Sequence, residues 1–503
     1  MFNFNLSVKI YRSIDQIIMK KIFIIQFLLI VASLFGGCQD EGTGWTPDMI
    51  PDENLPSDDD DDDEQVYAPI SLNAPLYWSV YEYAWVAEQA GSNTNMPEVT
   101  WDANIDWVSE NLLPYGYDMI CTDGFMSMTN DPGIEPGGYM THYAGIKLTD
   151  LVAKCKAKGL KLGVYDNPLW VHCSYETVVK GTEGITVGSL VYDSDKDDVL
   201  YPDKGDVFTW IVPSHKGAKE FIDGFFKYYK KIGVEFIRMD FLCLFETGDG
   251  AGGMPGRGYG REEYELALKY ISEAATKYQV FTSLVMPNLK NDAELEKKYG
   301  NMIRVDADTM KGGWQHFASN GPTWFNPNGW PSTSNMFTGL ISWSHIAGRG
   351  KVVLDADFTR LNTFDTEGEK QSVISLQLMA GGPIAVADQY NTIVSGDLKF
   401  YQNEELLALN KDGFVGKPLS DDLWNAKNQI WYGQMSDGDY IIGFFNKEDN
   451  EYDRTLDFSE IGIEGKVKVR DLWKHQDEGE AETSLSYKIP GRSCKIVRLT
   501  KSE

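Results

Sequence analysis

The chain has 503 residues, of which 42% are hydrophobic and 13% aromatic, so it has ample material for a packed core. Its length fits two or three domains, or one large α/β barrel joined to a smaller unit. The formal net charge of −29 argues against nucleic acid as a partner, because phosphate binding needs clustered Lys and Arg.

The N-terminus has the pattern of a secretory signal peptide over residues 1–37, with the true start expected at Met19. Lys20 and Lys21 give it a positive end, and the apolar run over residues 22–37 is shorter than the roughly 20 residues that span a bilayer. Cys38 follows two small residues, as in the bacterial lipobox, where the cysteine is lipidated. The alternative is an ordinary signal peptide with an incidental cysteine.

Residues 38–67 are expected to form the lipidated cysteine and a disordered acidic tether. Twelve acidic residues and no Lys or Arg lie between Gln39 and Glu64, so the stretch repels itself and cannot build a core. It resembles the surface-export signals of Bacteroidetes lipoproteins. We expect a cell-envelope protein that is lipid-anchored to the outer membrane and exposed at the surface. A solvated spacer facing the periplasm is the alternative.

From residue 68 to residue 418, short apolar runs alternate with amphipathic helices. Apolar residues at helical spacing predict helices over 147–159, ending at Gly159, and over 218–229, before Gly233. The eight strand candidates cover residues 75–78, 117–123, 160–166, 234–240, 280–287, 302–308, 351–357 and 381–388. This order predicts an α/β protein with a (β/α)8 TIM barrel. A doubly wound sheet is the structural alternative, but no Gly-rich phosphate loop follows any candidate strand.

Residues 419–503 have a different pattern, with β-type runs separated by Asp, Gly and Asn turns. They predict a small C-terminal antiparallel β-sandwich domain. No CxxC motif or His/Cys cluster in the chain indicates a metal site. We therefore expect neither a metal nor another cofactor.

Carboxylates stand at the ends of many of the predicted barrel strands. They are Asp123, Asp166, Asp240, Asp306 or Asp308, and Asp357. The C-terminal ends of barrel strands form the active-site face, so a ring of acids is expected around one mouth. Such a ring suits a hydroxyl-rich ligand, and a pair of carboxylates suits glycoside hydrolysis. Tryptophans in loops and at strand ends, Trp78 and Trp314 among them, are candidates for stacking on sugar rings, with others expected in the core.

Four stretches carry a more specific signal: HYAGIKLTDLVAKCKAKGLKLGVYDN, GVEFIRMDF, NMIRVDADTMKGGW and VRDLWKHQDEGE. Together they resemble glycoside hydrolase family 27, the melibiase-like α-galactosidases of clan D, and they follow one another in the family's order. The similarity runs from about Ser71 to the C-terminus. It implies a retaining enzyme with a (β/α)8 barrel and a C-terminal antiparallel β domain that uses no metal.

The resemblance implies that Asp240 is the nucleophile of a double displacement. The family has a K-x-D pattern at this point, and here it reads Arg238-Met239-Asp240. A cation is therefore kept beside the carboxylate, where it favours the ionised form.

The acid/base falls on Asp308 by the same resemblance. Arg304 and Trp314 match the residues that flank the acid/base in the family pattern. Asp306 stays a competitor for the role, because side chains two apart on a strand share a face.

Further roles are implied by matching positions. Asp123 matches the first of two consecutive acids that hold sugar hydroxyls, and Cys173 and Cys243 match a disulfide beside the nucleophile, which an oxidising compartment permits. The residues expected to bind substrate are Trp78, Asp123, Asp166, Arg238, Asn288, Arg304, Trp314 and Asp357.

Departures from the family pattern bear on specificity. Gly124 replaces the second of the two consecutive acids, and Val285 stands where the family has a Glu that reads the sugar 2-position, with Asn288 further on. A site that loses hydrogen-bonding partners can change its substrate preference by orders of magnitude.

The expected function is therefore retaining hydrolysis of terminal α-galactoside-type linkages in oligosaccharides or polysaccharides. The alternatives are a related activity on a β-L-arabinopyranoside, an N-acetyl-α-galactosaminide or an α-glucan, or a surface lipoprotein that binds glycans without cleaving them. The lipid anchor is the only membrane contact expected.

Overall fold

The computed structural model describes residues 70, 73–124, 133–193, 198–199, 209–248, 258–318 and 324–502. The expected signal peptide, the lipidation at Cys38 and the acidic tether lie outside the described residues and stay predictions. In the described part, no helix is both long and apolar enough to cross a membrane.

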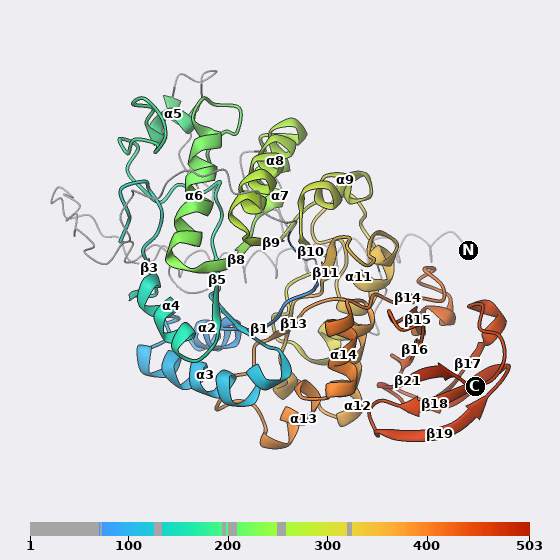
Figure 1. The fold of residues 1–503 in the computed structure, drawn as a ribbon. Helices are drawn as coiled ribbons and strands as arrows, with labels where there is room; N and C mark the ends of the chain where they lie inside the picture. Colours follow the sequence, from blue (N-terminus) through green and yellow to red (C-terminus); the bar gives the residue numbers. More distant parts are fainter. Residues whose placement is uncertain are drawn as a thin grey trace, which may run out of the picture.

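The larger part of the chain is a closed barrel of parallel strands, seen at the centre of Figure 1. Its strands are β1 (Leu76–Ser79), β2 (Met119–Cys121), β5 (Lys161–Tyr165), β8 (Val234–Met239), β9 (Phe281–Leu284), β10 (Met302–Arg304), β11 (Val353–Asp355), β12 (Phe358–Thr359) and β13 (Ile384–Val386). Only two residues separate β11 from β12, and these two pair with β10 and β13 respectively, which closes the ring. The ring therefore has eight strands, and all eight predicted strands are confirmed.

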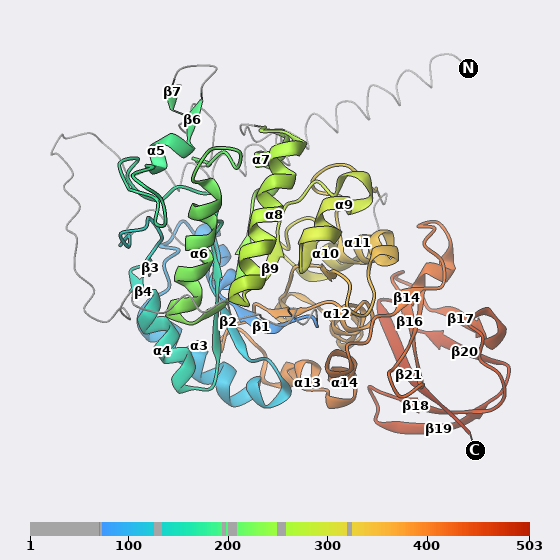
Figure 2. The same cartoon turned by 45° about the horizontal axis from the view of Figure 1, so that its top comes forward.

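Helices surround the barrel: α6 (Ala218–Ile232) packs against β8 and α8 (Arg261–Tyr278) against β9, and both helices are seen in Figure 2. Helix α6 confirms the helix predicted over 218–229, and it ends at Gly233, whose φ of 99° is the left-handed conformation that glycine tolerates. Helix α4 (Leu148–Ala157) confirms the other. The remaining large helices of the barrel are α2 (Tyr81–Gln89), α3 (Glu98–Asn111), α9 (Lys290–Tyr299), α11 (Met336–Trp343), α12 (Glu367–Met379) and α14 (Glu404–Asp412).

Side chains alternate across the barrel wall, as they must on a strand. One cluster of buried residues fills the interior and includes Tyr77, Met119, Cys121, Phe236, Met302, Val353, Phe358 and Ala385. Their chain neighbours, such as Trp78 and Ile237, belong to the larger cluster between the strands and the helices. This alternation decides which strand-end residues reach the inside of the mouth.

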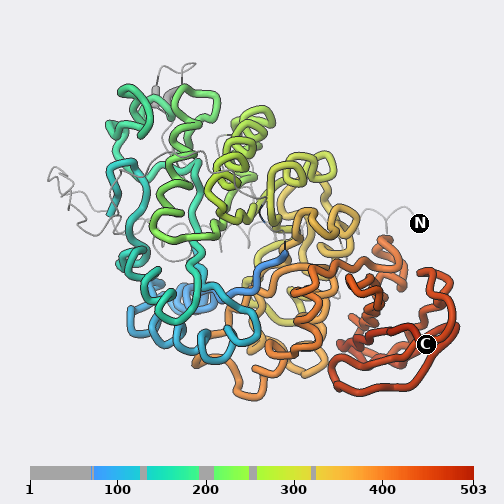
Figure 3. Tube along the Cα trace, in the orientation of Figure 1, coloured from blue at the N-terminus to red at the C-terminus, as the bar shows by residue number. Residues whose placement is uncertain are grey.

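The C-terminal domain consists of antiparallel strands and packs beside α12 and α14, as the red and orange segments of Figure 3 show. Its larger sheet has the order β14 (Lys417–Pro418), β15 (Ile430–Gln434), β16 (Tyr440–Asn446), β21 (Ser493–Lys501), β18 (Val467–Asp471) and β19 (Gln476–Ala481). The smaller pairs β17 (Tyr452–Asp457) with β20 (Ser484–Ile489). Arg470 ties this domain to Glu405 on α14 with two hydrogen bonds of 2.8 and 2.7 Å.

Candidate active site

A polar layer lies inside the barrel at the C-terminal ends of the strands. Phe236, Met302 and Val353 face the interior, so the residues two positions further on, Arg238, Arg304 and Asp355, face it as well. The Arg238 guanidinium lies over the interior ring of Phe358, 4.7 Å from its centroid, which confirms this direction.

Asp357 joins the two buried arginines of this layer. Its Oδ1 accepts hydrogen bonds from Nη2 of Arg238 at 2.9 Å and pairs with Nη1 of Arg304 at 2.6 Å. Its Oδ2 accepts from both the backbone N–H and the hydroxyl of Thr309, each at 2.7 Å. Burial alone would raise the pKa of Asp357, but the two arginines hold it below the usual value. Asp357 is thus an anion fixed within the protein.

Arg238 completes the pairing by donating Nη1 to Asp355 at 3.0 Å. Both ends of its guanidinium are therefore engaged by buried carboxylates, and the side chain is almost fully enclosed. Its expected role in holding substrate is not supported by this position. Its charge nevertheless counters the effect of burial on the pKa of Asp240.

Asp240 follows directly after β8, and each of its carboxylate oxygens has a donor. The Tyr165 hydroxyl donates to Oδ2 at 2.8 Å, and the backbone N–H of Phe241 donates to Oδ1 at 2.6 Å. The latter contact uses a left-handed Phe241 with φ of 62°, a conformation that is unfavourable for a bulky residue. Asn167 fixes the Asp240 carbonyl from the next strand at 3.0 Å. Burial raises the pKa of Asp240, while Arg238 and the two donors oppose that rise.

Asp308 and Asp306 have clearly different surroundings. Asp306 is fully buried, bonded to Nε of Arg304 at 3.1 Å and 3.2 Å from Nε2 of His316. The Asp308 side chain keeps 48% exposure and accepts from Nη2 of Arg304 at 3.3 Å. Desolvation by the surrounding protein raises the pKa of Asp308 to about 6; Arg304 opposes this, and the charges of Asp357 and Asp240 add to it. Of the two acids, Asp308 has the accessibility that an acid/base needs, and its raised pKa suits that role.

Asp123 reaches the same mouth from the end of β2. Burial raises its pKa to about 7, an effect that Arg238 opposes and that Asp357 and Asp240 increase. Tyr143 clamps its backbone by accepting from its N–H at 2.7 Å and donating to its carbonyl.

The position after Asp123 has no room for a side chain. A Cβ on Gly124 would lie 2.4 Å from Cζ and 2.6 Å from Oη of Tyr165, far inside van der Waals contact. The Tyr165 ring therefore fills the place where a second acid would start.

Two residues predicted to bind substrate point to the helix side of the barrel wall, because side chains alternate along each strand. Trp78 is completely buried on the helix side of β1, where its Nε1 donates to the Asp388 carbonyl at 2.9 Å, so it cannot stack on a sugar. Asp166 follows the interior-facing Tyr165 and is also fully buried. Its carboxylate accepts from Tyr229 on α6 at 2.6 Å and contacts His172 at 2.9 Å.

Two further residues that were expected to bind substrate contact other protein groups instead. Asn288 is buried, and its amide donates to Glu246 at 2.9 Å. Trp314 packs on Phe317 at 4.8 Å between ring centroids, with Arg492 of the C-terminal domain over its face at 5.9 Å. Trp314 therefore lies at the contact between the two domains.

The expected disulfide between Cys173 and Cys243 is not formed, because both are free thiols. The Cys173 sulfur lies against Gly138, 2.7 Å from where a Cβ on that glycine would be, whereas Cys243 is fully buried on α7 (Leu242–Thr247). Each thiol thus has its own packing environment.

The structure adds residues that sequence reasoning missed. Tyr165, Asn167 and Phe241 contact Asp240, and Thr309 binds Asp357. Alternation could have found Tyr165: Gly163 faces the interior, where an added Cβ would meet Phe236 at 2.9 Å, so Tyr165 faces it too. The left-handed backbone of Phe241 had no signal in the sequence.

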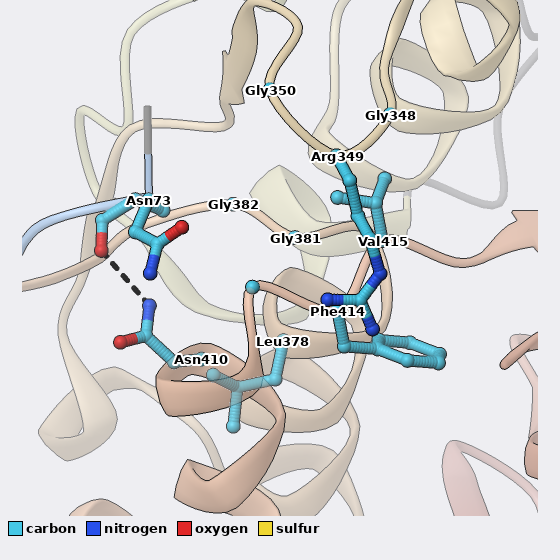
Figure 4. Close-up of a pocket in the computed structure, with 12 residues that line it drawn as sticks. Asn73, Gly348, Arg349, Gly350, Leu378, Gly381, Gly382, Asn410, Phe414 and Val415 are labelled. Atoms are coloured by element: carbon cyan, nitrogen blue, oxygen red, sulfur yellow. Dashed lines mark hydrogen bonds between the residues drawn. The ribbon is translucent and has the colours of Figure 1, made fainter. Parts of the chain in front are cut away.

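A small pocket lies at the opposite end of the barrel. Figure 4 shows it between Asn73, Arg349, Gly381 and Phe414, beside the hydrogen bond of 2.9 Å from Asn410 to the Ala74 carbonyl. Its volume of about 20 Å³ is suitable for a water molecule and far too small for a sugar.

Comparison with known proteins gives relatives for both domains. The family described as alpha galactosidase C-terminal beta sandwich domain matches residues 425–499. The chain is 36% identical over 445 residues to the isomalto-dextranase of Arthrobacter globiformis, an alignment that covers 85% of this chain and 67% of that enzyme. It is 24% identical over 427 residues to an α-galactosidase of Oryza sativa, which covers 83% of each chain.

Solved structures agree with the fold. The Arthrobacter globiformis T6 isomalto-dextranase complexed with panose has a TM-score of 0.76 at 32% identity, over 87% of this chain and 76% of that one. A GH27 β-L-arabinopyranosidase from Geobacillus stearothermophilus has a TM-score of 0.66 at 17% identity, over 86% and 97%. The second likeness concerns the fold alone. Together they confirm the predicted barrel followed by a β-sandwich domain.

Proposed function

Because the chain belongs to glycoside hydrolase family 27 of clan D, we propose that it is a retaining glycosidase that hydrolyses dextran-type α-glucans. The observation that carries the choice of sugar is the Tyr165 ring beside Gly124. In the α-galactosidase pattern, this place belongs to an acid that holds sugar hydroxyls. Galactose and glucose differ only in the orientation of one hydroxyl, so removing one hydroxyl-binding group bears directly on the choice between them.

A second departure from the family pattern also favours an α-glucan over an α-galactoside. Val285, which stands where the family has a Glu that reads the 2-position, is almost fully buried and offers no polar side-chain atom. Both departures replace a charged sugar-binding group by an apolar residue or by glycine. The relative with 36% identity is named for its action on dextran.

The mechanism is a double displacement. Asp240 attacks the anomeric carbon and forms a covalent glycosyl-enzyme, while Asp308 gives its proton to the leaving oxygen. Water then enters, Asp308 takes a proton from it, and the sugar leaves with its original anomeric configuration. The donors on both oxygens of Asp240 orient the carboxylate, and the raised pKa of Asp308 keeps a proton available at mildly acid pH.

A terminal α-galactoside is the second candidate. It is favoured by the α-galactosidase relative at 24% identity and by Asp123, the one hydroxyl-binding acid of the pair that remains. The location proposed for either activity is the outer membrane, with the enzyme held by a lipid on Cys38. Labelling with a radioactive fatty acid, lost in Cys38→Ala, together with protease digestion of whole cells, would test the anchor and the exposed face.

The experiment for the activity is hydrolysis by the full chain of dextran, p-nitrophenyl α-D-glucoside and p-nitrophenyl α-D-galactoside, with Asp240→Ala as the control. We expect release of glucose-containing products from dextran, with retained anomeric configuration by NMR, and no release by the variant. Release from the galactoside alone would replace the glucan proposal by the second candidate. Folded protein that is inactive on all three substrates would contradict both.

A further inference from the structure

The segment that follows the acid/base carries exposed aromatic side chains. Residues 324–335 lie between α10 (Gly313–Ala318) and α11, and Trp324 and Phe325 are 42% and 38% exposed. Exposed aromatic rings of this size are uncommon in the described barrel, where most of the tryptophans are buried. These two exposed rings distinguish the segment from most of the described barrel.

Backbone pairing fixes this segment to the acid/base. The N–H of Ala307, next to Asp308, donates to the Thr333 carbonyl at 3.0 Å, and Thr333 forms an antiparallel bridge with Phe325. The Asn326 N–H also donates to the Ser332 carbonyl at 2.7 Å. Paired backbones lie about 4.8 Å apart, so the Phe325 backbone is on the order of 10 Å from that of Ala307. That separation is comparable to one or two sugar rings.

The same segment touches the arginine that holds the acid/base. The Arg304 guanidinium lies 5.8 Å from the centroid of the Trp330 ring, and it also binds Asp308. The Thr333 hydroxyl adds a hydrogen bond of 3.2 Å to the Val305 carbonyl. These contacts hold the segment in a fixed position relative to the acid/base.

Phe325 and Trp324 have different surroundings. The Phe325 ring packs against the buried Trp343 on α11 with 5.5 Å between centroids. Neighbouring side chains on an extended strand point to opposite sides, so the Trp324 ring points away from Trp343. Phe325 anchors the segment, and Trp324 presents its ring.

We propose that Trp324 is the platform for the glucose unit on the leaving-group side of the scissile bond. The inference rests on the proposed glucan activity. The acid/base must stand beside the leaving oxygen that it protonates, so a segment bound to it flanks the sugar that leaves. The C–H face of a glucose ring is apolar and packs on an indole, as amphipathic ligands do in binding sites.

The test compares two substrates that share the sugar on the nucleophile side but differ in the leaving group. Dextran leaves a glucan chain, and α-isomaltosyl fluoride leaves a single ion that needs no platform. For Trp324→Ala in the full chain, kcat/KM on dextran should fall roughly threefold to tenfold, and kcat/KM on the fluoride should be unchanged. Trp324→Phe should keep most of the activity on dextran.

Trp424→Ala is the matched control, because Trp424 is 82% exposed but lies in the C-terminal domain. Its kcat/KM on both substrates should equal that of the wild type. An unchanged kcat/KM on dextran for Trp324→Ala would overturn the proposed role of Trp324, and so would equal losses on both substrates. Neither outcome would contradict the proposed glucan activity. Wild-type activity on the fluoride without activity on dextran would also overturn the platform. Inactivity on both would overturn the glucan proposal and the platform with it.

Discussion

The ring of Tyr165 occupies the place where a side chain on Gly124 would begin, 2.4 Å from Cζ, and its hydroxyl binds Asp240 at 2.8 Å. One residue thus orients the expected nucleophile and closes the space beside Asp123. The proposed choice of sugar and the geometry of the expected nucleophile are therefore linked, and a change in one should disturb the other.

Gly124→Asp tests this link directly. The new side chain must displace the Tyr165 ring, so Asp240 loses its hydroxyl donor. A hydrogen bond to a charged group contributes about 1.5–3 kcal/mol, so kcat/KM should fall roughly tenfold to hundredfold. Gly396→Asp is the control, because nothing lies within 4 Å of a Cβ at Gly396. Wild-type kinetics for Gly124→Asp would mean that the ring can move without consequence.

Tyr165→Phe separates the hydroxyl from the ring. The hydroxyl donates to the ionised form of Asp240 and lowers its pKa, so its removal should raise that pKa. A higher pKa leaves fewer molecules with an ionised nucleophile at low pH. The acid limb of kcat/KM against pH should therefore move to higher pH, with the alkaline limb in place. An unmoved acid limb would show that the hydroxyl does not act on Asp240.

Asp308→Asn tests the acid/base through pH. The wild type should lose activity as pH rises through about 6, where Asp308 gives up its proton. In the variant this alkaline limb should disappear and the hydrolysis of dextran should fall far more than that of a glycosyl fluoride. Asp306→Asn is the comparison. If that variant alone removed the alkaline limb, the two roles would have to be exchanged.

The raised pKa of Asp308 also predicts that the stability of the folded protein changes with pH. The pKa of Asp308 is raised from 3.8 to about 6, so folding favours its protonated form. The stability that the proton provides is complete below pH 3.8 and is lost as pH rises through 6. Asp308→Asn should therefore raise Tm relative to the wild type more at pH 8 than at pH 4. Equal shifts at both pH values would contradict this sign.

Arg238→Met should be strongly destabilising. It leaves Asp355 without its Arg238 partner and removes one of the two cations from Asp357 in a buried layer. Breaking such a buried pair costs about 3–5 kcal/mol, measurable by denaturant unfolding. Arg349→Met, which breaks a pair with Asp412 in which the arginine is 41% exposed, should cost less than Arg238→Met.

The free thiols give a chemical test. Alkylation of unfolded protein without reductant should label both Cys173 and Cys243, as detected by peptide mass spectrometry. Cys173→Ala should leave Tm almost unchanged. If both cysteines were labelled only after reduction, the expected disulfide between them would be present after all.

The barrel was readable from the sequence because each strand is a short apolar run and each helix repeats its apolar residues at a fixed spacing. The site was readable only in part. Asp123, Asp240, Arg304 and Asp308 meet at one mouth, as strand-end position suggests.

The predicted substrate contacts that the structure does not support share a physical cause. Trp78 and Asp166 stand at strand ends but on the helix side of the wall, which strand position alone does not reveal. Arg238 faces the interior but is taken up by carboxylates from β11 and the turn after it, a contact between residues more than a hundred positions apart. Such long-range pairing leaves no trace in local sequence patterns.

The break between β11 and β12 has a consequence for how the molecule assembles. Arg238 and Arg304 enter the barrel on earlier strands, whereas Asp355 and Asp357 arrive with the seventh, which is also the strand that joins β10 to β13. Until that strand docks, Arg238 lacks both of the carboxylates that it pairs with, while Arg304 keeps only Asp306 and Asp308. Closure of the ring and completion of the ion pairs of Arg238 therefore occur together, and an unclosed barrel leaves a buried cation without its partners, which costs free energy.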